Sequence, residues 1–291
     1  MKLLIIGASG VLGSRLYNDT IKNKWNVTGT FCSHEREGLS CLDVSDKNGL
    51  EKIFYSFKPE VVVMAGGITN VDLCTLKPKL AEDVNINGTL NLVRKIKEYG
   101  SKLVHISTDY IFDGKNGPYK EEDKTNPINK YGETKLEAEN IIRSKLKNYL
   151  IVRTAQLCGI DHTGKNFVLK IIQNMKSGKK VYAANDLYST PTYSGLLSDI
   201  IIKLIEKKAA GIYHGAGSEF INRYDYVNKI ADVFGLDKSL IQRVELKDLE
   251  LIARRPKKGG LRVDKVMREK ITVPYDCGTG LEFLKKDMDC A

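Results

Sequence analysis

The stretch Leu3-Leu4-Ile5-Ile6-Gly7-Ala8-Ser9-Gly10-Val11-Leu12-Gly13 decides the fold of this chain. Its four leading apolar residues predict a buried strand, and the glycines that follow at intervals of three lead directly into a helix reaching about residue 24. Glycines in such a turn let the backbone approach a pyrophosphate, whose charge is met by the free N–H groups of the helix N-terminus. The sequence therefore predicts a dinucleotide-binding turn formed by Gly7, Ser9, Gly10, Val11, Leu12 and Gly13.

Strands and helices are expected to alternate along the first half of the chain. The strands are predicted at 3–6, 26–31, 60–64, 102–106 and 149–153, with helices at 47–57, 79–99 and 131–147. This alternation is typical of βαβ units, so we predict an α/β fold with a doubly wound, Rossmann-like parallel sheet. We assign residues 1–155 to a dinucleotide-binding domain. Residues 156–291 are expected to form a smaller C-terminal α/β substrate domain, packed over the carboxyl edge of the sheet and able to return a strand to it.

The composition indicates which classes of partner and which cellular compartment to expect. The 291 residues carry a net charge of +10, yet the lysines are scattered among acidic residues, so no nucleic acid partner is expected. No apolar run approaches about 18 residues and the apolar N-terminus ends at Gly7, so neither a membrane span nor a signal peptide is expected. The six cysteines lie far apart, which is typical of free thiols in a reducing, cytoplasmic compartment. The histidines at positions 34, 105, 162 and 214 lack the spacing of metal ligands, and no metal is expected.

A second stretch, residues 107–135, carries candidate chemistry. Ser107 and Thr108 follow the strand predicted at 102–106, and a turn-rich loop leads from them to a helix that begins Tyr131-Gly-Glu-Thr-Lys135. Tyr131 and Lys135 are four residues apart and share one helical face, about 6 Å apart at Cβ. A lysine ammonium close to a phenol lowers the pKa of the phenol. Tyr131 is therefore expected to protonate a carbonyl oxygen near neutral pH, with the Thr108 hydroxyl as a second hydrogen-bond partner.

The residues after the second strand bear on the identity of the dinucleotide. The strand ends in Thr30-Phe31-Cys32-Ser33-His34-Glu35-Arg36, with no acidic residue directly at its tip to bind a ribose 2′-hydroxyl. His34 and Arg36 could instead face a 2′-phosphate. We therefore predict NADP as the cofactor and keep NAD as the alternative.

Three features of the chain coincide and resemble a known family. They are Gly7-x-x-Gly10-x-x-Gly13 after the first strand, Ser107-Thr108-Asp109 after the fourth, and Tyr131-x-x-x-Lys135 on the next helix. Together they resemble an extended short-chain dehydrogenase/reductase. Further motifs over nearly the whole length are similar to the dTDP-4-dehydrorhamnose reductase family, including Tyr110-Ile111-Phe112-Asp113-Gly114, Gly164-Lys165-Asn166-Phe167-Val168, Pro191-Thr192, Gly211-Ile212-Tyr213-His214 and Arg255-Pro256.

The resemblance implies an activity in nucleotide-sugar biosynthesis and a set of site residues. A hydride from NADPH or NADH would reduce the C4 ketone of a nucleotide-linked 6-deoxy-4-keto sugar. Tyr131 would donate the proton, Lys135 would lower its pKa and hold the nicotinamide ribose, and Thr108 would orient the carbonyl. The cofactor would also contact Arg36, Asp43, Val44, Ala65, Gly66, Gly67 and Ser107. The substrate would contact Thr108, Phe112, Gln156, Asn166 and Arg255. The protein could also form a homodimer.

Several positions depart from the family pattern. After Arg153-Thr154 the family usually carries a Ser-Trp pair, where this chain has Ala155 and Gln156, and glycines 259 and 260 stand where a serine is usual. Intact catalytic residues beside altered substrate-side residues suggest reductase chemistry on a somewhat different sugar nucleotide. Two alternatives stay open. One is a nucleotide-sugar epimerase or dehydratase that retains NAD, and the other is a non-catalytic NADP-binding regulatory subunit resembling the β subunit of methionine adenosyltransferase.

Overall fold

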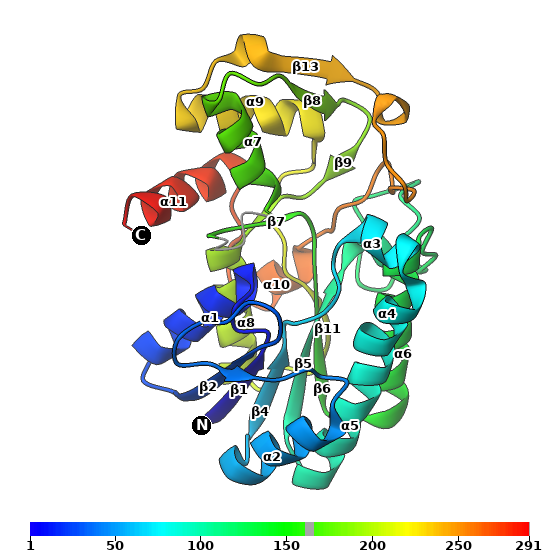
Figure 1. The fold of residues 1–291 in the computed structure, drawn as a ribbon, viewed down its shortest axis with the longest axis vertical. Coiled ribbons are helices and arrows are strands. Elements are labelled where there is room, and N and C mark those ends of the chain that lie inside the picture. The colour runs from blue at the N-terminus through cyan, green and yellow to red at the C-terminus, as the bar shows by residue number, and fades with distance from the viewer. Residues whose placement is uncertain (161–165, 291) are drawn as a thin grey trace.

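A seven-stranded parallel sheet forms the centre of the molecule (Figure 1). The computed structural model describes residues 1–160 and 166–290, so His162 and the Gly164-Lys165 part of the motif above lie outside the described residues. The strand order is β11-β6-β5-β4-β1-β2-β3, and every neighbouring pair is parallel. The predicted α/β fold with a Rossmann-like sheet is therefore confirmed. Its strands are β1 (Lys2–Ile6), β2 (Asn26–Phe31), β3 (Ser40–Cys41), β4 (Val61–Met64), β5 (Lys102–Thr108), β6 (Tyr149–Thr154) and β11 (Gly211–His214).

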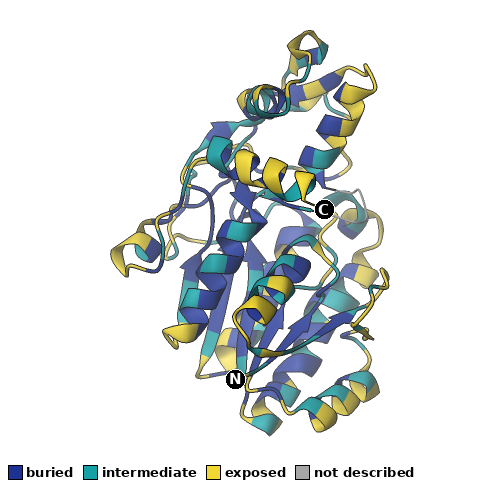
Figure 2. Ribbon diagram, turned by 90° about the vertical axis from the view of Figure 1, so that its left-hand side faces the viewer, coloured by how far each residue is buried: buried dark blue, intermediate teal, exposed yellow. Residues whose placement is uncertain are grey.

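Helices cover both faces of this sheet. One face packs against α1 (Val11–Lys22), α8 (Ser194–Glu206) and α10 (Asp264–Arg268), and the other against α2 (Lys47–Phe57), α5 (Gly88–Tyr99) and α6 (Lys130–Lys145). Alternate residues of β1 enter the two cores, so Leu3, Leu4, Ile5 and Ile6 are all buried, as this apolar run predicts. Figure 2 shows this arrangement as buried strands between helices whose outer faces are exposed.

A smaller C-terminal region packs over the carboxyl edge of the sheet (Figure 1). Its own core lies among α7 (Phe167–Lys176), α9 (Arg223–Phe234), α11 (Cys277–Asp289) and the parallel strands β8 (Val181–Ala184) and β13 (Ile241–Val244). Two-residue ladders pair β7 (Leu157–Cys158) with β10 (Thr192–Tyr193) and β9 (Tyr188–Ser189) with β12 (Ile221–Asn222). Short 3₁₀ turns occupy Asp109–Ile111, Lys238–Leu240 and Leu246–Asp248. Because β11 and α8 come late in the chain and still belong to the sheet layers, the chain crosses back to the sheet after leaving it.

The helix expected at 79–99 is present, but its middle is not α-helical. After the separate α3 (Val71–Leu76), the helical backbone runs through α4 (Pro78–Glu82), a π-helical turn at Asp83–Asn87 and then α5. The wide turn contains Asn85, whose side chain accepts from the Ile68 N–H (2.9 Å) and donates to the Ile68 carbonyl oxygen (3.0 Å) and to the Thr134 hydroxyl (3.1 Å). These long-range bonds fix the loop after β4 against α6, and no local sequence pattern announces them.

A buried ion pair holds α6 on the sheet. Arg153 on β6 donates to both carboxylate oxygens of Glu139, with Nε 3.0 Å from Oε1 and a terminal nitrogen 2.7 Å from Oε2. The two side chains are 2% and 0% exposed. A fork-to-fork pair in such surroundings fixes geometry as well as charge. It therefore sets the position of the helix that carries Tyr131 and Lys135.

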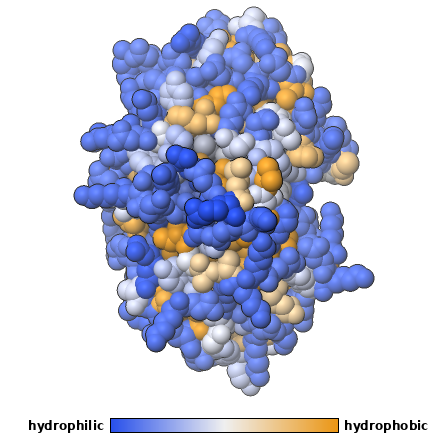
Figure 3. All heavy atoms as spheres, turned by 180° about the vertical axis from the view of Figure 1, so that it is seen from behind, coloured by the Kyte–Doolittle hydropathy of each residue, from blue (hydrophilic) through white to orange (hydrophobic). Residues whose placement is uncertain are grey.

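The surface is mainly hydrophilic. Viewed from behind, apolar side chains reach the surface in separate areas, mostly in the band between the two regions (Figure 3). Among the described residues, no helix is long and apolar enough to cross a membrane. The same residues contain no group of three or more His, Cys, Asp or Glu side chains that could hold a metal ion.

Candidate active site

In the glycine turn between β1 and α1, two of the three glycines allow backbone segments to approach so closely that no side chain would fit. Gly7 has φ +84°, and a Cβ there would lie 2.6 Å from the Gly66 Cα. A Cβ at Gly13 would lie 2.1 Å from the Gly7 carbonyl oxygen. Gly10 is different, since its Cβ would meet only that oxygen, at 3.4 Å, and the residue is exposed. The first turn of α1 also has no side-chain cap, which leaves its N–H groups free for an anion.

The other residues of the predicted turn divide between surface and core. Ser9 and Val11 are half-buried, whereas Leu12 is 4% exposed and packs in the core beneath the sheet. Their backbones therefore line the turn, and the Leu12 side chain serves the packing of α1.

The segment after β4 lies beside this turn. The Ala65 N–H donates to the Ile6 carbonyl oxygen (3.0 Å), which continues the ladder between β1 and β4. Gly66 backs onto Gly7, and Gly67 has φ +149° with the Asn85 side-chain oxygen 2.9 Å from where its Cβ would lie. The three small residues thus lie directly beside the glycine turn.

Residues expected near the adenosine end occupy the tips of β2 and β3. Val44 is buried, and a Cβ at Gly88 would lie 2.5 Å from its Cγ1. Asp43 is exposed, and its Oδ1 accepts from the backbone N–H (2.8 Å) and the hydroxyl (2.7 Å) of Ser45. Arg36 is half-buried with one terminal nitrogen inaccessible and without a partner among the described residues. An unpaired guanidinium nitrogen at this place fits a bound phosphate.

Thr108, Tyr131 and Lys135 lie together at the carboxyl end of β5. Thr108 is the last residue of the strand, and its hydroxyl lies close enough to the Tyr131 phenol to affect the pKa of that phenol. Tyr131 stands in the first turn of α6, whose N-cap Asn129 accepts from the Gly132 N–H (2.9 Å). One turn later, the Lys135 ammonium donates to the Ile106 carbonyl oxygen (2.7 Å). Capping and strand contacts therefore bring the three side chains to one place.

Burial controls the charge of these groups. It raises the pKa of Tyr131 well above its ordinary value, although the Thr108 hydroxyl beside the phenol acts in the opposite direction. The lowering expected from Lys135 is therefore wrong for the protein without ligand. Burial also lowers the pKa of Lys135 to about 8, while the Glu139 carboxylate raises it. At neutral pH Tyr131 is a phenol with its proton in place, which is the form that a general acid needs.

His105 is a neighbour of Lys135 that the sequence interpretation missed. Its Nε2 lies 3.1 Å from the Lys135 ammonium, and burial together with that charge lowers the pKa of His105 well below its usual range. The ring is therefore neutral and accepts from Lys135 at Nε2. The only available signal was its spacing, since His105 and Ser107 are two residues apart and share one face of β5. Both keep a buried polar atom without a partner among the described residues, His105 at Nδ1 and Ser107 at Oγ.

Two expected substrate residues have structural duties. Phe112 is fully buried, stacked on Tyr119 with ring centroids 4.3 Å apart, and the structure gives it no face for a substrate. Asn166 caps α7 by accepting from the Val168 N–H (2.9 Å), and it donates to the Leu157 carbonyl oxygen (3.1 Å). The motif similarity carried no information on which of these side chains pointed inward.

Gln156 is the substrate-side residue with an uncommitted group. Its backbone has φ +38°, a conformation that residues other than glycine rarely adopt. Its Nε2 is buried without a hydrogen-bond partner among the described residues. Strained backbone and an unpaired donor at one residue are features of functional sites.

The loop that carries Arg255 is tied down at several points. Arg255 forms an ion pair with Asp72 (3.0 Å) and donates to the Ala253 carbonyl oxygen (2.8 Å). Further along, the Gly260 N–H donates to the Asp109 carboxylate (3.0 Å), and a Cβ at Gly259 would lie 2.8 Å from the same oxygen. A side chain at position 259 would therefore crowd Asp109, and Gly260 has φ +80°, a conformation that favours glycine. Burial raises the pKa of Asp109 to about 6.

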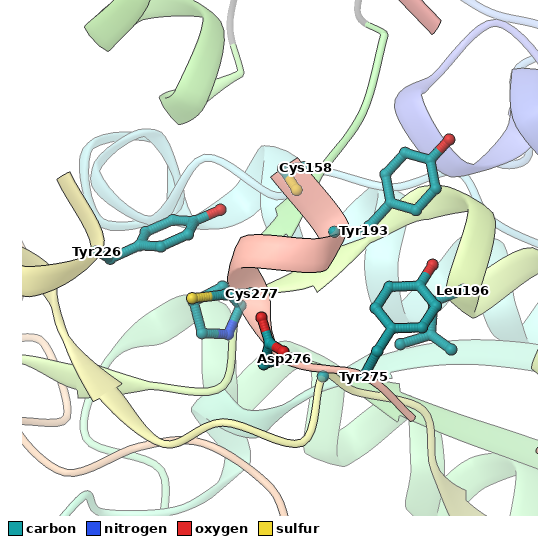
Figure 4. A pocket seen from close by; sticks show the side chains of 10 residues that line it. Cys158, Tyr193, Leu196, Tyr226, Tyr275, Asp276 and Cys277 are labelled. Carbon is teal, nitrogen blue, oxygen red and sulfur yellow. The ribbon is translucent and has the colours of Figure 1, made fainter. Parts of the chain in front are cut away.

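Two hollows accompany these residues. A groove of about 780 Å³ runs between loop 113–115 and segment 246–258, and six lysines or arginines and one aspartate line it. Arg255 lines this groove, but Thr108, Tyr131 and Lys135 do not. The second hollow is a narrow gap in the C-terminal region where Cys158, Tyr226 and Cys277 gather near the start of α11 (Figure 4). It has no room for a water molecule and is a packing gap.

Proteins of two functional kinds are similar to this chain. Residues 1–288 match the family model described as RmlD substrate binding domain. A dTDP-4-dehydrorhamnose reductase from Aggregatibacter actinomycetemcomitans is 30% identical over 297 residues, covering 98% of this chain and 98% of that protein. Methionine adenosyltransferase 2 subunit beta from Xenopus laevis is 28% identical over 250 residues, covering 84% of this chain and 75% of that protein. The structure of a dTDP-4-dehydrorhamnose reductase from Bacillus anthracis in complex with NADP has a TM-score of 0.90 at 25% identity, covering 98% of this chain and 99% of that one.

Proposed function

Because the chain belongs to the RmlD substrate binding domain family, we propose that it reduces the C4 ketone of a nucleotide-linked 6-deoxy-4-keto sugar with NADPH. The observation that carries this proposal is the cluster of Thr108, Tyr131 and Lys135 at the carboxyl end of β5. A similar reductase over nearly the whole length supports it. Incubating the purified protein with NADPH and dTDP-linked 4-keto-6-deoxy sugars, and following cofactor oxidation, tests it.

Each residue of the cluster has a distinct task. The buried Tyr131 phenol keeps its proton and donates it to the oxygen of the ketone as that oxygen gains charge. The Thr108 hydroxyl, which lies beside the phenol, would turn toward the same oxygen. Lys135 keeps a positive charge next to the site below about pH 8. His105 and the Ile106 carbonyl oxygen fix its ammonium.

The residues around the glycine turn fit a dinucleotide. The uncapped start of α1 and the exposed Gly10 suit its pyrophosphate, and the unpaired Arg36 nitrogen suits a 2′-phosphate. Residues 65–67 and Ser107 would line the nicotinamide end, with Asp43 and Val44 near the adenine. When bound, the nicotinamide supplies the hydride. Residues 1–155 would thus bind the cofactor and residues 156–291 the sugar nucleotide, with Gln156 as its nearest uncommitted donor.

Replacing Arg36 by Ala is expected to weaken NADPH binding by about 10- to 100-fold and to leave NADH binding nearly unchanged. The reason is that only NADPH carries the 2′-phosphate that would pair with the guanidinium. Fluorescence titration of both cofactors, with wild type and variant, measures the ratio. An equal loss for both cofactors would show that Arg36 supports the loop and does not read the phosphate.

The charge of Lys135 predicts a pH dependence. Its pKa, lowered by burial to about 8, means that the ammonium is present below that pH and is lost as the pH rises through it. Affinity for NADPH should therefore fall above about pH 8, because a neutral amine binds ribose hydroxyls more weakly. Lys135→Met should bind weakly at every pH and show no such decline. A decline of the same size in the variant would assign the titration to another group.

A second candidate function is that of a regulatory subunit. The similarity to methionine adenosyltransferase 2 subunit beta is close to that of the reductase in identity, and Gln156 replaces the aromatic residue that the reductase pattern carries there. Such a protein would bind NADP and leave nucleotide keto sugars unchanged. Tight association with a methionine adenosyltransferase, together with no turnover of any nucleotide-linked 4-keto sugar, would favour this function.

A further inference from the structure

Arg223 is a half-buried arginine without an acidic partner. It is the first residue of α9, and its guanidinium lies over the Phe167 ring, 4.3 Å from the ring centroid. Its Nε is inaccessible, and within residues 1–160 and 166–290 no group accepts a hydrogen bond from its side chain. The helix N-cap, Asn222, and the nearby Asp225 bond to each other and not to Arg223. A guanidinium held in this way costs free energy unless something else neutralises it.

The groups that face Arg223 include one carboxylate, that of Asp109, which forms no ion pair with it. These groups are Asp109 and Tyr110 directly after β5, Arg255 from the C-terminal loop and Tyr226 from α9 itself. The two oxygens of Asp109 accept from the Gly260 N–H (3.0 Å) and the Thr108 hydroxyl (3.3 Å). Burial raises the pKa of both tyrosines, so they are neutral. Arg255 is positive and opposes Arg223, and Asp72 is already paired with it.

Arg223 lies near the residues that directly follow the candidate catalytic Thr108. Asp109 and Tyr110 come directly after Thr108, so Arg223 approaches the loop that starts at the candidate catalytic hydroxyl. In a nucleotide sugar the diphosphate is attached at C1, across the sugar ring from C4. A ketone at Tyr131 therefore needs an anion site about one sugar ring away.

From this arrangement we infer that Arg223 binds the diphosphate of the sugar-nucleotide substrate, an inference that rests on the proposed function. The planar guanidinium offers several donors in a fork that matches phosphate oxygens, and the Phe167 ring keeps its plane in place. Arg255, which the resemblance placed in contact with the substrate, is already bonded to Asp72 and to the Ala253 carbonyl oxygen. It therefore adds positive charge to the area without a free donor directed at the diphosphate. Gln156 adds a second unpaired donor on the same side of the C-terminal region. It precedes Leu157, whose carbonyl oxygen is bonded to Asn166, the residue before Phe167.

The test is the binding of dTDP, inorganic pyrophosphate and thymidine by calorimetry, with the cofactor site saturated by NADPH. Wild type should bind dTDP and pyrophosphate, and thymidine much more weakly, since thymidine lacks the anion. Arg223→Gln should weaken dTDP binding by about 10- to 100-fold, and Arg223→Lys should fall between. Arg243→Gln is the matched control, because Arg243 is an exposed arginine that also stacks on a tyrosine ring in this region. It should bind dTDP as wild type does.

Thermal melting distinguishes a ligand site from a structural role. Arg223→Met should melt at or above the wild-type temperature without ligand, because it removes an unpaired charge, and should lose the stabilisation that dTDP gives wild type. A lower melting temperature with unchanged dTDP affinity would overturn the inference, as would no binding of dTDP or pyrophosphate by wild type. If dTDP binding depends on Arg223 but no nucleotide-linked keto sugar is turned over, the diphosphate site is supported and the proposed reductase activity is refuted.

Discussion

Replacing Tyr131 by Phe is expected to lower turnover of a nucleotide-linked 4-keto sugar by at least about 100-fold, the effect typical of a lost general acid. The phenol is the proposed proton donor to the ketone oxygen, and burial keeps its proton in place at neutral pH. The Phe ring can keep the packing, since Tyr131 meets Tyr110 edge to face with centroids 5.7 Å apart. NADPH affinity and melting temperature should therefore stay close to wild type. Single-turnover kinetics at saturating cofactor measure the chemical step.

The neighbouring phenol provides the control. Tyr110→Phe removes the hydroxyl of the ring that packs against Tyr131 and keeps the same ring contact, so less than about a tenfold change is expected. If Tyr110→Phe were the damaging change and Tyr131→Phe retained activity, the proton donor would be misassigned. If both variants kept full activity, the cluster at β5 would not be the acid at all.

Replacing Gly13 by Ala is expected to disrupt the glycine turn. The new Cβ would lie 2.1 Å from the Gly7 carbonyl oxygen and 2.8 Å from the Ala8 Cα, and both are backbone atoms that cannot rotate away. Helix α1 must therefore move off the turn, which costs about 1–3 kcal/mol of unfolding free energy and displaces the N–H groups that would face the pyrophosphate. We expect a lower melting temperature together with a loss of NADPH affinity of at least about 100-fold.

Gly10→Ala separates packing from cofactor binding. Its Cβ would meet only the Gly7 carbonyl oxygen, at 3.4 Å, and its backbone has an ordinary φ of −80°. The melting temperature should stay close to wild type, while NADPH affinity falls because the methyl group enters the space that a pyrophosphate needs. Asn18→Ala, an exposed change on the same helix, should alter neither property. Unchanged affinity in both glycine variants would remove the turn from the cofactor site.

The parts of the fold that follow from local pattern could be predicted from the sequence. The apolar run of β1 and the spacing of the glycines predict a strand, a turn and a helix. These elements depend on residues only a few positions apart, so they can be read from the sequence. The spacing of Tyr131 and Lys135 fixes one helical face in the same way. The order of the strands and the return of β11 to the sheet then follow from the rules of parallel α/β folds.

The remaining features depend on contacts between distant residues. The π-helical turn exists because Asn85 bonds to Ile68 and Thr134, and Phe112 is buried because Tyr119 stacks on it. The pKa of Tyr131 rises because of burial, which helical spacing alone cannot reveal. Similarly, the ion pair of Arg255 joins it to Asp72, a residue far away in the sequence. The surroundings of Arg223 likewise come from distant segments, among them Asp109, Tyr110 and Arg255.

The most direct measurement of the central claim is the transfer of deuterium from NADPH labelled at nicotinamide C4 to a dTDP-linked 4-keto-6-deoxy sugar. We predict that wild type transfers the label from one face of the cofactor to C4 of the sugar, one sugar reduced for each NADPH oxidised. Tyr131→Phe should bind NADPH normally and transfer at least about 100-fold more slowly. If wild type binds NADPH and the nucleotide sugar but leaves the label on the cofactor, the protein is not a 4-keto reductase of these sugars.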